Sequence, residues 1–99
     1  MRQPLRHLII SAHAHEQLSE LSRDVAARAL ALSAALAAGQ AHAFAGAKRL
    51  KRAHDVHAAR VDLSHRVLFL LTRTELRVEE VIDRRDLEQT IDRLRSSGR

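Results

Sequence analysis

The stretch AARVDLSHRVLFLL, residues 58–71, decides the fold that we predict for this chain. Two runs of alanine, valine and leucine, typical of strands, flank a short polar break that contains Asp62. A break this short favours an antiparallel hairpin, because consecutive strands usually pair. An arginine stands on each side of the break, Arg60 and Arg66. The predicted hairpin therefore places two cations beside residues that resemble sheet core.

Strand and helix patterns continue on both sides of the hairpin. DVHAARV, HRVLFLLT and ELRVEEVI are three strand candidates, and residues 5–11 near the N-terminus are a fourth. Residues 12–38 carry apolar side chains at helical spacing, either as one long helix or as a pair broken near Ser22. We favour the pair, because the single helix would be long for a small domain. Residues 84–97 predict a closing helix.

The order of these segments predicts the fold class. The 99 residues suit a single domain, residues 1–99, with residues 96–99 as a disordered tail. We predict an α+β fold in the order β-α-α-β-β-β-α. In it, an antiparallel-rich four-stranded sheet packs against an N-terminal helical hairpin and a C-terminal helix.

Composition limits the functional classes. The chain has no cysteine, tryptophan or tyrosine and only two phenylalanines, so its core must be aliphatic. Without cysteine there is no disulfide framework, which fits a cytoplasmic protein. The apolar run at residues 8–10 is too short for a signal peptide or a membrane span. We therefore expect no membrane association.

The net charge of +5 is concentrated in one cluster, KRLKR at residues 48–52. A basic cluster suits nucleic acid or an acidic protein partner, whereas a solvated linker is the structural alternative. The candidate nucleic-acid-binding residues are Lys48, Arg49, Lys51 and Arg52.

The chain resembles the RelE/ParE superfamily of toxins from type II toxin–antitoxin systems. The resemblance covers about residues 5–95, and three pieces carry it in order. They are Arg60-Val61 at a strand end, Arg66-Val67-Leu68-Phe69 after the turn, and DRRDL at residues 83–87 before the closing helix. The basic lead-in at residues 48–52 also matches the family pattern.

The resemblance implies one of two activities. RelE-like members are mRNA endonucleases that act in the ribosome without a metal, and ParE-like members act on DNA gyrase without being nucleases. Both kinds bind an antitoxin, so the resemblance implies an acidic antitoxin partner. It also implies that the chain forms a hetero-oligomer with the antitoxin or a homodimer. This chain departs from the nuclease pattern at His57, Ala58 and Ala59, where lysines are usual. It also lacks the C-terminal tyrosine or histidine. A catalytically inactive binding protein therefore remains a third interpretation.

The resemblance makes Arg60, Arg66, Arg84 and Arg85 candidate catalytic residues for stabilising charge on a phosphate. The alternatives are ion pairs of the hairpin arginines with Asp62, Glu79 or Glu80, and local neutralisation of Arg84 and Arg85 by Asp83 and Asp86.

The seven histidines offer proton transfer more than metal binding. His57 and His65 adjoin the arginine hairpin, and imidazole titrates near neutral pH. Exposed structural histidines are the alternative. The histidine spacings do not form a recognised zinc motif, so we expect no metal and no cofactor.

Overall fold

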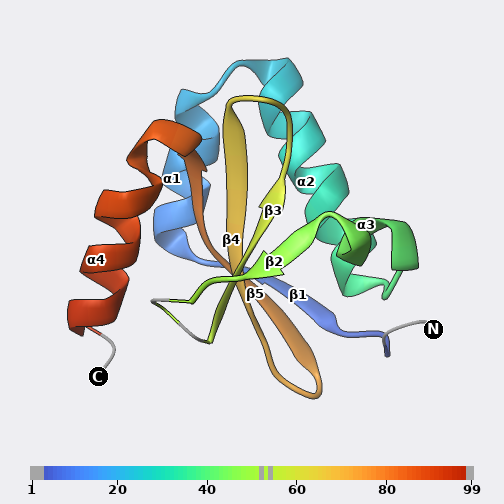
Figure 1. The fold of residues 1–99 in the computed structure, drawn as a ribbon. Coiled ribbons are helices and arrows are strands. Elements are labelled where there is room, and N and C mark those ends of the chain that lie inside the picture. Colours follow the sequence, from blue (N-terminus) through green and yellow to red (C-terminus); the bar gives the residue numbers. More distant parts are fainter. Residues whose placement is uncertain (1–3, 52, 54, 98–99) are drawn as a thin grey trace.

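The structure, a computed structural model, describes residues 4–51, 53 and 55–97, without the side chains of 96 and 97. Figure 1 shows the fold. The elements are β1 (His7–Ile10), α1 (Ala12–Glu20), α2 (Arg23–Ala37), α3 (Ala41–Ala45), β2 (Ala47–Arg49), β3 (Val56–Arg60), β4 (His65–Leu71), β5 (Glu75–Asp83), the 3₁₀ turn η1 (Arg84–Asp86) and α4 (Leu87–Ser97).

The strands form one mixed sheet in the order β1-β5-β4-β3-β2. The strands β2 to β5 pair antiparallel, and β1 joins β5 in parallel, with His7 opposite Glu75. The predicted hairpins and the first strand in the same sheet are confirmed. The first strand is shorter than predicted, because only residues 7–10 pair.

The predicted strand count was wrong by one. The segment that we treated as a connection contains α3 and the edge strand β2, whose Lys48 pairs with Ala58. A three-residue strand with two charged side chains lacks the β-branched alternation that marks a strand in sequence. Charged residues on an edge strand are instead typical of protection against pairing with other chains.

Two serines start the paired helices. Ser11 Oγ accepts the backbone N–H of Ala14 at 3.0 Å, and Ser22 Oγ accepts that of Val25 at 3.2 Å. Ser22 is thus the N-cap of α2, which confirms the predicted break. Gly39, with φ 75°, follows the end of α2 as the left-handed residue that glycine supplies there.

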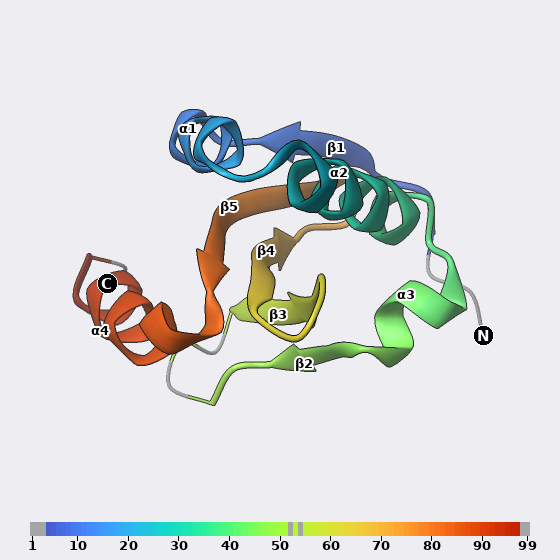
Figure 2. The same ribbon diagram turned by 90° about the horizontal axis from the view of Figure 1, so that it is seen from above.

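Helices cover both faces of the sheet. On the face that we call the α2 face, Val67, Phe69 and Val78 pack with Ala29 and Leu36 of α2. On the opposite face, the α4 face, Ala58, Leu68 and Ile82 pack with Ile91 of α4. Figure 2 shows α2 and α4 on opposite sides of the central strand β4. The apolar spacing noted over residues 12–38 reflects burial, since Leu18 of α1 and Leu36 of α2 lie in the core.

The C-terminal end agrees with the predicted end of the closing helix and not with a tail that begins at residue 96. We expected disorder from residue 96, but α4 extends to Ser97. Residues 98 and 99 lie outside the described part of the chain. Among the described residues, no helix combines the length and the apolar character needed to cross a membrane.

Candidate nucleic-acid interface

Arg60 and Arg66 occupy directly opposite positions at the last pair of β3 and β4. Opposite residues in an antiparallel pair project from the same face, and alternate residues of a strand share a face. Both arginines therefore share the α4 face with Ala58 and Leu68. Arg60 is exposed and Arg66 is half-buried. Two guanidinium groups thus project from the same face at the turn end of the hairpin.

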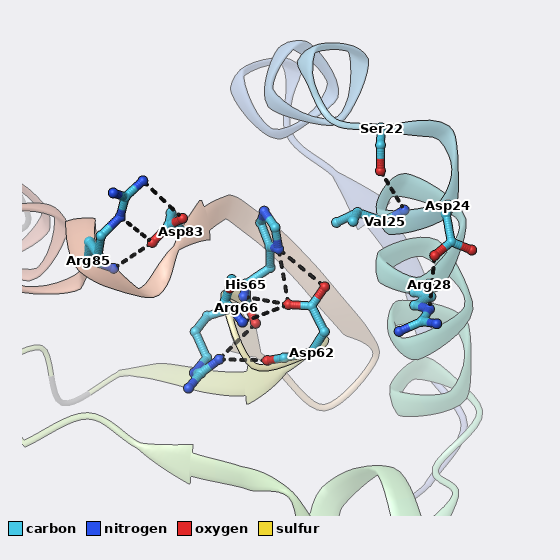
Figure 3. Close-up of polar contacts among 10 residues, drawn as sticks. Ser22, Asp24, Val25, Arg28, Asp62, His65, Arg66, Asp83 and Arg85 are labelled. Atoms are coloured by element: carbon cyan, nitrogen blue, oxygen red, sulfur yellow. Dashed lines mark hydrogen bonds and ion pairs between the residues drawn. The ribbon is translucent and has the colours of Figure 1, made fainter.

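The Arg66 guanidinium is held by the turn that precedes it. Its Nη1 donates to the backbone carbonyl oxygens of Asp62 and His65, each at 3.0 Å. Figure 3 shows this contact, with the His65 ring leaving the chain on the other side. Its Nε and Nη2 groups have no partner among the described residues. This fork suits an oxyanion such as phosphate.

Carboxylates do not neutralise this pair within the described chain. Asp62 bonds the His65 ring, Glu79 lies 3.8 Å from Arg77, and Glu80 bonds Arg93 at 2.9 Å. The alternative that Arg60 or Arg66 pairs with one of these three carboxylates is therefore wrong. Both cations remain available to an external anion.

The β3–β4 turn is closed by the carboxylate of Asp62. Its Oδ1 accepts the backbone N–H groups of Ser64 and His65, both at 2.8 Å, and lies 3.0 Å from His65 Nδ1. The Ser64 N–H, and after it the His65 side chain, lower the pKa of the Asp62 carboxyl. The Ser64 carbonyl in turn accepts the Arg84 N–H at 2.7 Å. The turn is thus anchored internally and to the end of β5.

The two candidate histidines lie on the other face. His57 is opposite Phe69 and stacks on its ring with centroids 5.3 Å apart, inside the α2 face. Its Nδ1 is buried without a hydrogen-bond partner. Burial, and then the charge of Arg49, lower the pKa of His57. His65 shares the α2 face by strand alternation. The structure therefore corrects our placement of these imidazoles beside the arginine pair, since residues one step apart on a strand point oppositely.

Arg84 and Arg85 differ in their surroundings. Arg85 Nε donates to Asp83 Oδ1 at 3.1 Å, so the predicted alternative of local neutralisation holds for this residue. The backbone N–H of Arg85, and then its side chain, lower the pKa of Asp83. Arg84 has an exposed side chain, and its backbone bond to Ser64 places it beside the turn. Arg84 is therefore the better third cation for this surface.

The predicted basic cluster divides between the two faces. Lys48 is opposite Ala58 and so shares the face of Arg60, whereas Arg49 is opposite His57 and belongs to the α2 face. Lys51 is exposed after β2, and Arg52 lies outside the described residues. We define the basic face as Lys48, Arg60, Arg66 and the adjacent Arg84.

A shallow pocket of about 330 Å³ lies away from the basic face. Its lining consists of Arg49, Asp55, His57, Leu70, Leu71 and Thr72. Neither hairpin arginine contributes to it. In the described part of the chain, no three His, Asp or Glu side chains gather into a metal site.

Glu80 is a buried charge that sequence reasoning missed. Its side chain is 4% exposed and lies within 3.1 Å of His13 and 2.9 Å of Arg93. The pairing with β4 skips Glu79, which marks a bulge in β5 next to Glu80. Two adjacent acids between valines, VEEV, were the only sign in the sequence, because strand alternation would bury just one of them.

Comparison with known proteins identifies the fold. Neither a family model nor a curated protein matches the chain. Among solved structures, a chain of the toxin–antitoxin complex RelBE2 from Mycobacterium tuberculosis matches with TM-score 0.68 and 17% identity. That match covers 82% of this chain and 100% of the other. The chain has a RelE-like toxin fold.

Two further structures share this RelE-like fold. YafQ of Escherichia coli matches with TM-score 0.65 and 17% identity, over 83% of this chain and 97% of YafQ. A chain of the YoeB dimer from Staphylococcus aureus matches with TM-score 0.64 and 13% identity. That match covers 80% of this chain and 97% of the YoeB chain. The predicted fold resemblance is confirmed.

Proposed function

We propose that this chain is the toxin of a toxin–antitoxin system and acts as a ribosome-dependent mRNA endonuclease with atypical catalytic residues. The observation that supports this proposal is the opposed pair Arg60 and Arg66, on a RelE-like fold and without carboxylate partners among the described residues. In this role the protein works in the cytoplasm, where its substrate is.

The arginines supply phosphate binding and charge stabilisation. The Nη1 group of Arg66 is held by two backbone carbonyl oxygens. The guanidinium is therefore already in place to donate from Nε and Nη2 to a phosphate oxygen. A preorganised donor of this kind stabilises negative charge that develops on the phosphate during cleavage. Arg60 and Arg84 add positive charge beside it. We assign the proton transfer to neither His57 nor His65, because both belong to the α2 face.

The antitoxin is expected to be acidic. We propose that one of its segments covers residues 48–52 and Arg60, in a hetero-oligomer or on a homodimer of this chain. The exposure of Lys48, Arg49 and Arg60 supports this contact. Covering the basic face would also block RNA binding. The antitoxin would therefore inhibit the toxin without needing a second binding site.

Two features favour the alternative functions. The basic face carries no histidine in the described chain, and Ala58 and Ala59 stand on β3 where nuclease members have lysines. These features suit a non-nuclease toxin that acts on DNA gyrase, or an inactive fold kept for binding.

Induction in a bacterial host separates these functions. Growth, mRNA integrity and plasmid supercoiling are measured for the unchanged chain, Arg66→Ala and Arg73→Ala. Arg73 is an exposed arginine at the far end of the β4–β5 hairpin and serves as the control. We expect the unchanged chain to cleave mRNA. Arg66→Ala should lower the rate of cleavage by about a hundredfold to a thousandfold, as removal of a transition-state donor does. Arg73→Ala should keep the rate of the unchanged chain.

Other outcomes contradict the nuclease proposal. Intact mRNA with altered supercoiling supports the gyrase function. Growth arrest without either effect excludes both targets. Full mRNA cleavage by a folded Arg66→Ala protein removes the arginine from the site.

A further inference from the structure

Leu63 lies at the tip of the β3–β4 turn, between the two hairpin arginines, and its exposure is 77%. It belongs to the few large apolar side chains of the described chain that are open to solvent; the others are Leu5, Leu8 and Leu30. A single exposed leucine is ordinary on a protein surface. Leu63 is distinguished by its position between the hairpin arginines and by the hydrogen-bonded turn that carries it.

The turn holds Leu63 away from the core. Asp62 accepts the N–H groups of Ser64 and His65, and the Val61 N–H donates to the His65 carbonyl at 3.0 Å. These bonds enclose Leu63 on both sides. They hold the backbone of the turn in a conformation in which the Leu63 side chain is exposed to solvent.

Leu63 is also next to the anchored guanidinium. Arg66 Nη1 lies 3.0 Å from the Asp62 carbonyl oxygen, and that carbonyl is directly bonded to the Leu63 nitrogen. The turn therefore anchors a cation at the carbonyl group that precedes an exposed leucine. A nucleotide has the matching chemistry, because its phosphate is anionic and the faces of its base are apolar.

Aromatic side chains do not serve this surface. Phe69 is fully buried, and Phe44 packs edge-on to it at 6.4 Å inside the α2 face. Leucine can take the place of an aromatic side chain in such a contact, since proteins that bind the minor groove of DNA insert leucine and other apolar side chains between bases. Unstacked bases are accessible in single-stranded RNA and not in its duplex.

We infer that Leu63 packs on the nucleobase beside the phosphate held by Arg60 and Arg66, so that the turn recognises single-stranded RNA. This inference rests on the proposed function and adds how that site reads its substrate.

The test compares two probes of equal length, a short single-stranded RNA and a ribose-phosphate oligomer without bases. Affinities are measured by fluorescence anisotropy for the unchanged chain and for Leu63→Ala, Leu63→Phe, Arg66→Ala and Leu5→Ala. Leu5, 76% exposed, is the matched control because it lies on the N-terminal side of β1. Circular dichroism confirms that each variant folds.

We expect Leu63→Ala to weaken RNA binding by about threefold to tenfold, as for an incompletely covered leucine side chain, and to leave the oligomer without bases unaffected. Leu63→Phe should restore or strengthen RNA binding. Leu5→Ala should change neither affinity, and Arg66→Ala should weaken both.

The outcomes separate the inference from the function. Unchanged RNA affinity in Leu63→Ala, with Arg66→Ala impaired, overturns the base contact and leaves RNA as the target. Equal losses on both probes also overturn it, because the leucine would then act through the turn. RNA affinity that is unaffected by Arg66→Ala contradicts the proposed function itself.

Discussion

Glu80 on β5 accepts a hydrogen bond from the Arg93 guanidinium of α4 across 2.9 Å, although most of the Arg93 side chain is exposed. The other carboxylate oxygen of Glu80 accepts from Gln17 Nε2 of α1, also at 2.9 Å. Helices from opposite faces of the sheet are thereby joined through one buried carboxylate. The hydrogen bond that Arg93 donates to Glu80 also raises the pKa of Arg93.

Arg93→Gln should lower the free energy of unfolding by about 1–3 kcal/mol, because a buried acceptor loses a charged donor. The value is at the lower end for a buried pair, since Arg93 is half-exposed and Gln17 remains bonded. Urea denaturation measures it. Arg28→Gln is the control, because the Arg28–Asp24 pair is exposed and should contribute about 0–0.5 kcal/mol. Equal effects of the two changes would show that Glu80 needs no cation.

Asp62→Ala should loosen the β3–β4 turn and weaken RNA binding, because the carboxylate holds two backbone N–H groups. Amide hydrogen exchange at Ser64 and His65, measured by NMR, should accelerate. Asp62→Asn keeps an acceptor oxygen and should retain most of the protection. Protection that survives in Asp62→Ala would mean that the Arg66 and Arg84 contacts alone hold the turn.

Stability should fall as the pH drops below about 6.5, the ordinary pKa of histidine, because of His57. Its pKa is lowered by burial and by Arg49, so the folded state binds this proton less readily than the unfolded state. The contribution is therefore complete above the unfolded pKa and disappears as the pH falls through the folded pKa. Protonation would also leave a buried Nδ1–H without an acceptor.

His57→Phe measures this effect, because phenylalanine keeps a ring against Phe69 and cannot titrate. Urea midpoints between pH 7.5 and 5 should fall less in the variant than in the unchanged chain. His42→Phe is the matched control, because the same replacement is made at an exposed position. Asp62 and Asp83 also have lowered pKa values, but their stabilisation is lost below about pH 4, outside this window. Parallel curves for all three proteins would exclude His57 as the cause.

Association with an acidic antitoxin should slow steeply as salt increases, because interface charge mainly raises the association rate. Replacing Lys48 and Arg49 together with glutamine should flatten this dependence, which stopped-flow mixing at several NaCl concentrations measures. Arg23→Gln with Arg28→Gln, on α2, removes the same charge elsewhere. If both double variants alter the slope equally, only net charge matters and the docking surface lies elsewhere.

The features that could be predicted from the sequence were those determined by residues close together in the chain. The break between the paired helices was predictable at Ser22, because a serine side chain can cap a helix within its first turn. The hairpin around Asp62 was predictable from two apolar runs and a short break. Lys48 and Arg49 gave no strand signal, because β2 exists through pairing with β3 and not through the preferences of its own residues.

The candidate site was predictable only in part for the same reason. Arg60 and Arg66 could be chosen from sequence, but their opposition depends on the register of the turn. The histidines were placed wrongly because sequence proximity to an arginine ignores strand alternation, which puts His65 and Arg66 on opposite faces. The Glu80–Arg93 contact depends on a bulge and on where α4 packs, and neither follows from local spacing.

The parallel pairing of β1 with β5 has a consequence for synthesis on the ribosome. His7 pairs with Glu75, and Ser11 Oγ donates to the Glu79 carbonyl, 68 residues further along the chain. The first strand thus emerges early and waits for the last strand of the sheet, and contacts between such distant residues form slowly. The helices can form during translation, but the completed sheet must await release of β5 from the exit tunnel. A nascent chain therefore cannot assemble the native fold while most of the sheet is still being translated.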